Sequence, residues 1–137
     1  MSMSQFIEKE MDILWSDFED YGVEQKLEAF ERLKKSATEE DLPKLVELLK
    51  SARNDFWVRE LLSEPISDLG GTKYLSDLLD ALELNEQEGH DNDGFNHQLI
   101  EIAWADPDGC KEKLINLLAD PTFRHREVAE WLLTFCE

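Results

Sequence analysis

Basic residues are scarce in this chain of 137 residues: it has 14 Lys and Arg against 32 Asp and Glu, which gives a formal net charge of −18. Binding to nucleic acid or to anionic lipid depends on Lys and Arg that neutralise phosphates. A strongly acidic surface repels both ligands. We therefore expect neither a nucleic-acid nor a membrane partner, and the charge instead favours a basic protein.

Cysteines are also few, and no Cys-x-x-Cys motif is present. Cys110 and Cys136 cannot form a disulfide framework or a zinc or redox motif, so we expect them to be reduced, buried thiols. The first residues lack the basic and apolar stretches of a secretion signal, and no apolar run approaches the length of a membrane span. We expect a cytoplasmic protein.

Catalytic motifs are missing as well, because the sequence has neither a Gly-rich phosphate loop nor a Gly-x-Ser-x-Gly elbow. We therefore expect no enzymatic activity and no cofactor. The hydrophobic fraction of 42% is too high for a disordered chain of this charge. A single folded domain over residues 1–137 is the simplest expectation.

Apolar residues recur at helical spacing along nearly the whole chain, and no long alternating β pattern interrupts them. This predicts an all-α fold of about eight helices. In the second helix, Val23, Leu27, Phe30 and Leu33 would form the apolar face. Asp-Pro at 106–107 and again at 120–121 is typical of an N-cap followed by the first helical residue, so the last two helices are expected to begin there.

A Leu-x-x-Leu-Leu pattern occurs three times, at 45–49, 75–79 and 114–118. Each copy is followed by a polar break and a second helix. Aligning these second helices puts Arg59, His97 and Arg126 in register, provided that residues 83–93 are an insertion in the middle copy. Such self-similarity indicates a repeat architecture.

The repeat resembles the HEAT-like helical repeats, whose second helix carries Arg followed three residues later by Leu or Ala. Arg59 with Leu62 and Arg126 with Ala129 match this element. The resemblance implies a short α-solenoid with a concave ligand surface. Capping helices over 1–37 would precede repeat units at 38–71, 72–105 and 106–137. An antiparallel helical bundle is the alternative fold.

One segment, 74–110, contains no Lys or Arg and ten acidic residues. Like charges at helical spacing destabilise helices, so an uncompensated acidic patch is easier to explain if a basic partner covers it. The alternative is a solvated helix face. The binding residues that we expect are seven acids and two aromatic anchors: Asp77, Asp80, Glu83, Glu86, Glu88, Asp91 and Asp93, with Phe56 and Trp57. Otherwise the four tryptophans, Trp15, Trp57, Trp104 and Trp131, are expected mainly in the core.

Small acidic HEAT-like proteins are similar to some bacterial immunity proteins, which neutralise a toxin by occluding its surface. The resemblance therefore implies a non-catalytic module, monomeric when free, that captures a basic protein, most concretely a toxin. A general adaptor or regulatory scaffold is the alternative. It would use the same fold but bind several partners through apolar groove residues.

The insertion also raises the hypothesis of a metal site. An EF-hand fails here, because Gly89 and Ile100 would occupy two of the ligand positions. His90, Asp91, Asp93 and His97 could bind a transition metal, but no further constellation supports this, and a helix-capping loop explains the acids as well. We expect no metal, and a metal-dependent enzyme is the least favoured function.

Overall fold

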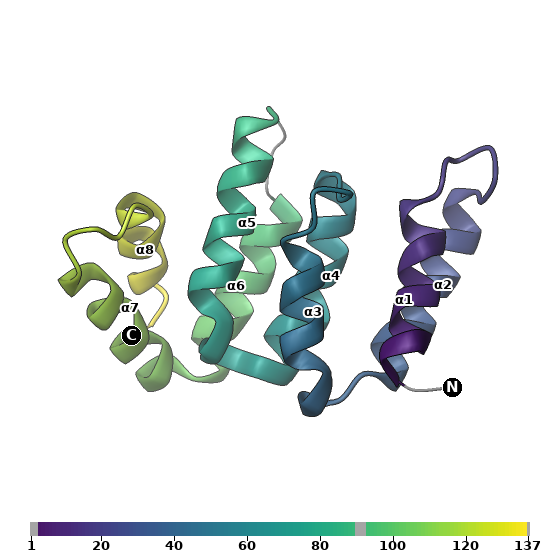
Figure 1. Ribbon diagram of the computed structural model, residues 1–137. Helices are drawn as coiled ribbons and strands as arrows, with labels where there is room; N and C mark the ends of the chain where they lie inside the picture. The colour runs from purple at the N-terminus through teal and green to yellow at the C-terminus, as the bar shows by residue number, and fades with distance from the viewer. Residues whose placement is uncertain (1–2, 90–92, 137) are drawn as a thin grey trace.

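Figure 1 shows the computed structural model of the chain, which describes residues 3–89 and 93–136. The described residues form eight α-helices and two 3-10 helices and contain no strand, which confirms the predicted all-α fold. The helices are α1 (Met3–Trp15), α2 (Val23–Ser36), η1 (Glu39–Asp41), α3 (Leu42–Leu49), α4 (Phe56–Gly70), η2 (Gly71–Tyr74), α5 (Leu75–Gln87), α6 (Asp93–Ala105), α7 (Pro107–Ala119) and α8 (Arg126–Leu133). No helix in the described ranges is long and apolar enough to cross a membrane.

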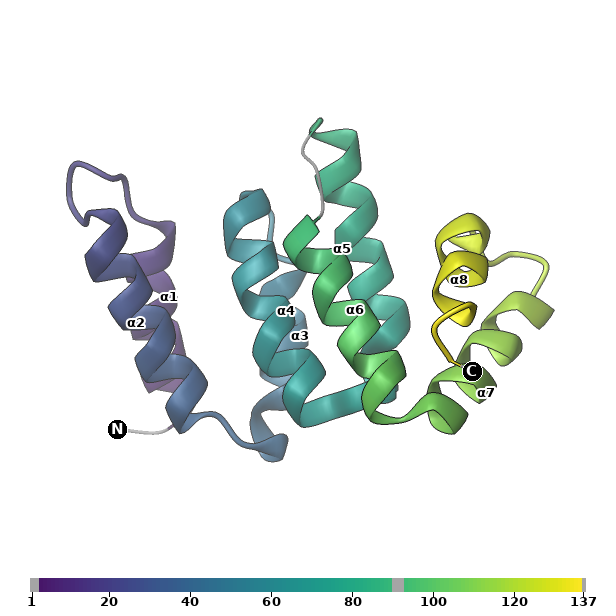
Figure 2. The same ribbon diagram turned by 180° about the vertical axis from the view of Figure 1, so that it is seen from behind.

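Consecutive helices lie in pairs: α1 packs with α2, α3 with α4 and α7 with α8, whereas α5 lies beside α6 but has its closer contacts with α4. Figures 1 and 2 show the four pairs side by side in chain order, with α1 and α2 at one end of the row and α7 and α8 at the other. The helices α4 and α6 also pack against each other, which joins the two middle pairs.

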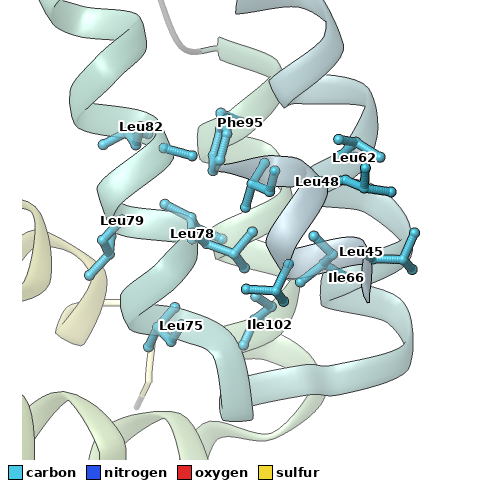
Figure 3. Packing of buried hydrophobic residues seen from close by; sticks show 14 of the residues in the cluster. Leu45, Leu48, Leu62, Ile66, Leu75, Leu78, Leu79, Leu82, Phe95 and Ile102 are labelled. Carbon is cyan, nitrogen blue, oxygen red and sulfur yellow. The ribbon is translucent and has the colours of Figure 1, made fainter. Parts of the chain in front are cut away.

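The repeated leucines form much of the core between the pairs. Those of the first two motifs are all buried, and Figure 3 shows residues of both motifs packed with side chains of α4 and α6. In the third motif only Leu114 is buried, whereas Leu117 and Leu118 are half-buried. This difference follows from the position of α7 at the end of the row, where a neighbour covers only one side.

The predicted apolar face of α2 is partly wrong. Val23 and Leu27 are 53% and 40% exposed, and the buried positions include Lys26, which is only 3% exposed. The Nζ of Lys26 donates to the main-chain oxygens of Leu14 and Ser16 at the C-terminal end of α1. The last carbonyls of a helix lack intrahelical partners, so a buried cation is stabilised at this place.

The predicted start of the last helix is also wrong, because α8 begins at Arg126. Asp120 accepts hydrogen bonds from the main-chain N and the hydroxyl of Thr122, at 2.9 and 2.7 Å, and so makes a turn rather than a helix cap. Residues 120–125 are therefore a loop. Asp106, by contrast, accepts from the N–H of Gly109 at 3.0 Å and caps α7 as predicted.

Two of the three residues aligned by the repeat make similar contacts. Arg59 donates to the main-chain oxygen of Asn54 at 3.3 Å, and Arg126 donates to those of Leu118 and Asp120 at 2.7 and 3.1 Å. Each guanidinium thus holds the chain that leads into its own helix. His97 differs, because it is exposed and contacts only its helical neighbour Glu101 in the described part of the chain, at 3.1 Å.

Candidate functional site

Helix α5 carries four of the expected binding acids, Asp77, Asp80, Glu83 and Glu86, and Glu88 follows directly as its C-cap residue. The first four are spaced by three residues, so they follow one slowly rotating face of the helix. Glu86 and Glu88 are exposed, whereas Asp77, Asp80 and Glu83 are half-buried. The exposure of these acids therefore increases along α5, from half-buried near its start to exposed at its end.

The acid nearest the start of α5 is paired with a lysine of α3. Asp77 lies 2.5 Å from the Nζ of Lys50, which follows the last residue of α3. This hydrogen bond, supported by the charges of Asp77 and Asp80, raises the pKa of Lys50 above its usual range. Asp77 is thus already neutralised within the protein.

The next two acids are paired with the loop 120–125. His125 places its Nε2 2.6 Å from an oxygen of Asp80 and its Nδ1 3.0 Å from an oxygen of Glu83. Both ring nitrogens of His125 thus face carboxylate oxygens. Its side chain is only 8% exposed. Arg124 adds a longer contact to Glu83, at 3.4 Å.

Glu88 is paired with Arg59 of α4, whose Nη1 lies 2.7 Å from both carboxylate oxygens and donates to Asn85 at 2.9 Å. Arg59 is only 6% exposed, so this contact ties α4 to the end of α5. The expectation that the acids of 74–110 are uncompensated is thus wrong for four of the five on α5 and its cap. Their basic partners come from segments far away in the sequence.

A groove of about 620 Å³ lies between α5, α6 and α8, and we call it the α5–α8 groove. Its lining residues are Leu82, Glu83, Glu86, Asn96, Arg124, His125, Glu127, Val128 and Trp131. Apolar side chains of α5 and α8 form part of the wall, with Trp131 37% exposed. Glu86 and Glu127 are exposed. The groove thus combines an aromatic surface with two solvated carboxylates.

The expected aromatic anchors lie elsewhere. Phe56 and Trp57 are half-buried at the start of α4, where Asp55 accepts from the N–H of Val58 at 2.9 Å. The ring of Trp57 packs on Phe18, with ring centroids 6.1 Å apart. Neither anchor lines the α5–α8 groove. The structure therefore does not gather Phe56 and Trp57 with the α5 acids in one groove.

Trp131 and Trp104 were expected in the core, and this prediction is wrong. They are 37% and 63% exposed. The inward positions of α8 are Ala129 and Leu132, and Trp131 lies off this stripe. Trp131 could have been identified from the sequence as a large aromatic residue beside the buried positions Ala129 and Leu132.

Two of the four residues of the predicted metal site, His90 and Asp91, lie outside the described residues. Asp93 is the first residue of α6, and His97 is exposed on that helix. Within 3–89 and 93–136, no group of three or more His, Cys, Asp or Glu is placed to hold a metal ion.

Both cysteines are free and buried, as predicted. Burial and the neighbouring Cys136 raise the pKa of the Cys110 thiol to about 12. The thiol therefore stays protonated at neutral pH and is a poor nucleophile.

No protein-family model, curated protein or solved structure matches the chain. The charge and shape of the grooves are thus the observations that bear on function.

Proposed function

We propose that the protein is a non-catalytic binding module, a short α-solenoid of HEAT-like helix pairs, that captures a basic segment of another protein in the α5–α8 groove. The observation that carries this proposal is the groove itself, where exposed Glu86 and Glu127 flank the aromatic surface of Trp131. Aromatic side chains are favoured anchors at protein interfaces.

The row of four helix pairs supports the solenoid part of the proposal (Figures 1 and 2). The parallel roles of Arg59 and Arg126 support a common repeat unit, because each holds the chain that enters its helix. Stacked units of this kind present extended binding surfaces.

The negative charge of the protein indicates that the partner is basic. A net charge of −18 attracts a basic protein at long range and speeds the encounter. At the groove, the ion pair of Arg124 with Glu83 is weak, because its N–O distance is as long as 3.4 Å and the Arg124 side chain is 70% exposed. An incoming lysine or arginine can therefore displace Arg124. Glu86 and Glu127 then supply further acceptors, and Leu82, Val128 and Trp131 cover the apolar side of the segment.

The most concrete form of this function is an immunity-type inhibitor of a toxin. Here the carboxylates of the groove would occupy the lysines and arginines that the toxin uses to bind phosphate, and the bulk of the module would block the substrate. A general adaptor would instead bind through the apolar residues of the groove and would not depend on the acids.

The test uses an amphipathic peptide of Lys and Leu, with a Gln and Leu peptide as its uncharged counterpart. The indole N–H signal of Trp131 in the NMR spectrum reports binding. We expect the Lys peptide to shift this signal and to bind at least about tenfold more weakly when NaCl is raised from about 20 to about 500 mM. The uncharged peptide should leave the signal in place.

The matched variants are Glu86→Gln with Glu127→Gln in the groove, and Glu39→Gln with Glu40→Gln on η1, which are exposed and change the net charge equally. Only the first pair should weaken binding, by about fivefold to tenfold. Binding that ignores both salt and the groove pair would contradict the electrostatic proposal and favour the adaptor.

A further inference from the structure

A second groove, of about 430 Å³, lies where the C-terminal ends of α4 and α6 meet the start of α7. We call it the Trp104 groove. Its apolar wall is Ile102, Trp104 and Ala105, and its acidic residues are Asp68, Glu101 and Asp106. It shares no lining residue with the α5–α8 groove.

Trp104 is 63% exposed, although a tryptophan is usually mostly buried. Its indole forms part of a concave apolar surface beside Ile102 and Ala105. Covering such a ring releases water and is strongly favourable, and its face also attracts cations. The groove therefore suits a ligand that has both an apolar stem and a positive charge.

In this groove Glu101 lies 3.1 Å from His97 and Asp106 caps α7, whereas Asp68 has no ion pair in the described chain. Partial loss of solvent around the carboxyl, together with the charges of Glu64 and Glu101, raises the pKa of Asp68, and Lys34 offsets this only in part. Lys34 is itself bonded to Glu64, at 3.0 Å. None of the described residues that line the groove is Lys or Arg. The neighbours of Asp68 thus disfavour its charge, and a cation placed there would relieve the repulsion.

We propose that the Trp104 groove binds a lysine or arginine side chain of a protein partner, with the cation over the Trp104 indole and within reach of Asp68 and Glu101. Charge complementarity identifies the cation. The apolar wall identifies the amino acid, because a hydrated metal ion gains nothing from Ile102 and Trp104, whereas the methylene stem of Lys or Arg packs on them.

This inference goes beyond the proposed function, because it concerns a separate surface. The test titrates the protein with tri-arginine amide, and tri-glutamine amide is the uncharged control. The indole N–H signal of Trp104 and the side-chain carboxyl signal of Asp68 are followed by NMR. We expect tri-arginine to shift the Trp104 signal in a saturable way and to lower the pKa of Asp68, because a bound cation favours the carboxylate. Tri-glutamine should do neither.

Three variants locate the binding. Asp68→Asn should weaken the Trp104 response about fivefold, and Trp104→Ala should abolish the effect of tri-arginine on the pKa of Asp68. The matched control, Asp20→Asn, removes one exposed charge from the loop between α1 and α2 and should leave both responses unchanged. Because Asp68 and Trp104 are both exposed, we expect each variant to fold, and circular dichroism checks this.

A Trp104 signal that does not move, or that moves equally in Asp68→Asn, overturns the inference. So does a Trp104 shift that depends on protein concentration without peptide, because it would mean that a second copy of this chain covers the groove. The Trp131 signal separates the two proposals. A response at Trp131 alone supports the α5–α8 groove only, whereas a response at Trp104 alone supports this inference and contradicts the proposed function.

Discussion

At the scale of single residues, the cation of Lys26 closes the C-terminal end of α1. Its Nζ donates to the oxygens of Leu14 and Ser16 and lies 3.9 Å from the centroid of the Phe18 ring. Lys26 is only 3% exposed, so these contacts lie largely away from solvent. The lysine therefore satisfies polar groups that would otherwise be buried without a partner.

Replacing this lysine should destabilise the protein. Lys26→Met keeps the length of the side chain but removes its donors, so we expect the free energy of unfolding to fall by about 1–3 kcal/mol. Urea unfolding measures this change. Lys35→Met, at an exposed position of the same helix, is the control and should change stability by less than about 0.5 kcal/mol. Equal effects of the two substitutions would show that the buried contacts contribute nothing.

The thiol of Cys110 should make stability depend on alkaline pH. Its pKa is about 12 in the folded protein, against an ordinary value of 9.0. The folded state therefore keeps the proton to higher pH than the unfolded state, so the stabilisation is complete below about pH 9 and is lost as pH rises towards 12. The slope from this group approaches about 1.4 kcal/mol per pH unit.

Urea unfolding of the wild type and of Cys110→Ala, between about pH 8 and pH 11, tests this expectation. The variant should lose less stability over this range. Lysines such as Lys50, whose pKa is raised by a carboxylate, add a slope of the same sign to both proteins. Parallel curves for the two proteins would therefore mean that Cys110 does not contribute.

Sequence patterns do not predict the partners of single buried polar residues. A helical pattern places Lys26 and Arg59 only as polar positions, because the atoms that satisfy them, on α1 and α5, are far away in the sequence. For the same reason, the ion pairs of the α5 acids could not be predicted from the sequence. Their spacing along one face was visible in the sequence, whereas the positions of Lys50, Arg124 and His125 depended on the folded chain.

At the scale of elements, the loop 120–125 joins the last helix pair to α5. Its contact is His125, whose largely buried ring lies between Asp80 and Glu83. Helix α8 is short, spanning eight residues, and such helices depend on tertiary contacts for their stability. The position of α8 therefore depends in part on one imidazole.

His125→Gln should loosen this pair. Glutamine cannot place a ring nitrogen against each of the two carboxylates, so we expect a loss of about 1–3 kcal/mol in unfolding free energy and faster amide exchange in α8 than in α1. His97→Gln is the matched control, because the His97 side chain is 62% exposed. It should have little effect. Unchanged exchange in α8 of the His125→Gln protein would refute this role of the loop.

Helices as elements were predictable, because amphipathic spacing and the Asp106 cap follow from local chemistry. The start of α8 was not. Asp followed by Pro suits both an N-cap and the turn that Asp120 makes with Thr122, and the two differ only in which N–H the carboxylate binds. The loop that places His125 on α5 was therefore absent from the sequence prediction.

At the scale of the whole molecule, we expect charge repulsion to outweigh the ion pairs. Lys44 of α3 pairs with Glu8 of α1, and Arg53 of the loop before α4 pairs with Asp12 of α1; both pairs are partly or wholly exposed and contribute little. The net charge of −18 acts on every acidic side chain at once. This repulsion between acidic side chains destabilises the compact folded state.

Salt should accordingly stabilise the protein. We expect the free energy of unfolding to rise when NaCl increases from about 20 to about 500 mM, because screening weakens the long-range repulsion more than the short contacts. Glu39→Gln with Glu40→Gln removes two exposed charges and should show a smaller rise. A fall in stability with salt would show that the ion pairs dominate.

The partners of the α5 acids have a consequence for the evolution of this surface. A change at Asp80 or Glu83 removes one of the two carboxylates that face the buried ring of His125, so descendants should alter these positions together or retain them. Glu86 and Asp68 have no such bond in the described chain and are free to vary alone. Adaptation to a new partner should therefore proceed through unpaired groove residues such as Glu86 and Asp68, while Asp80 and Glu83 stay the same.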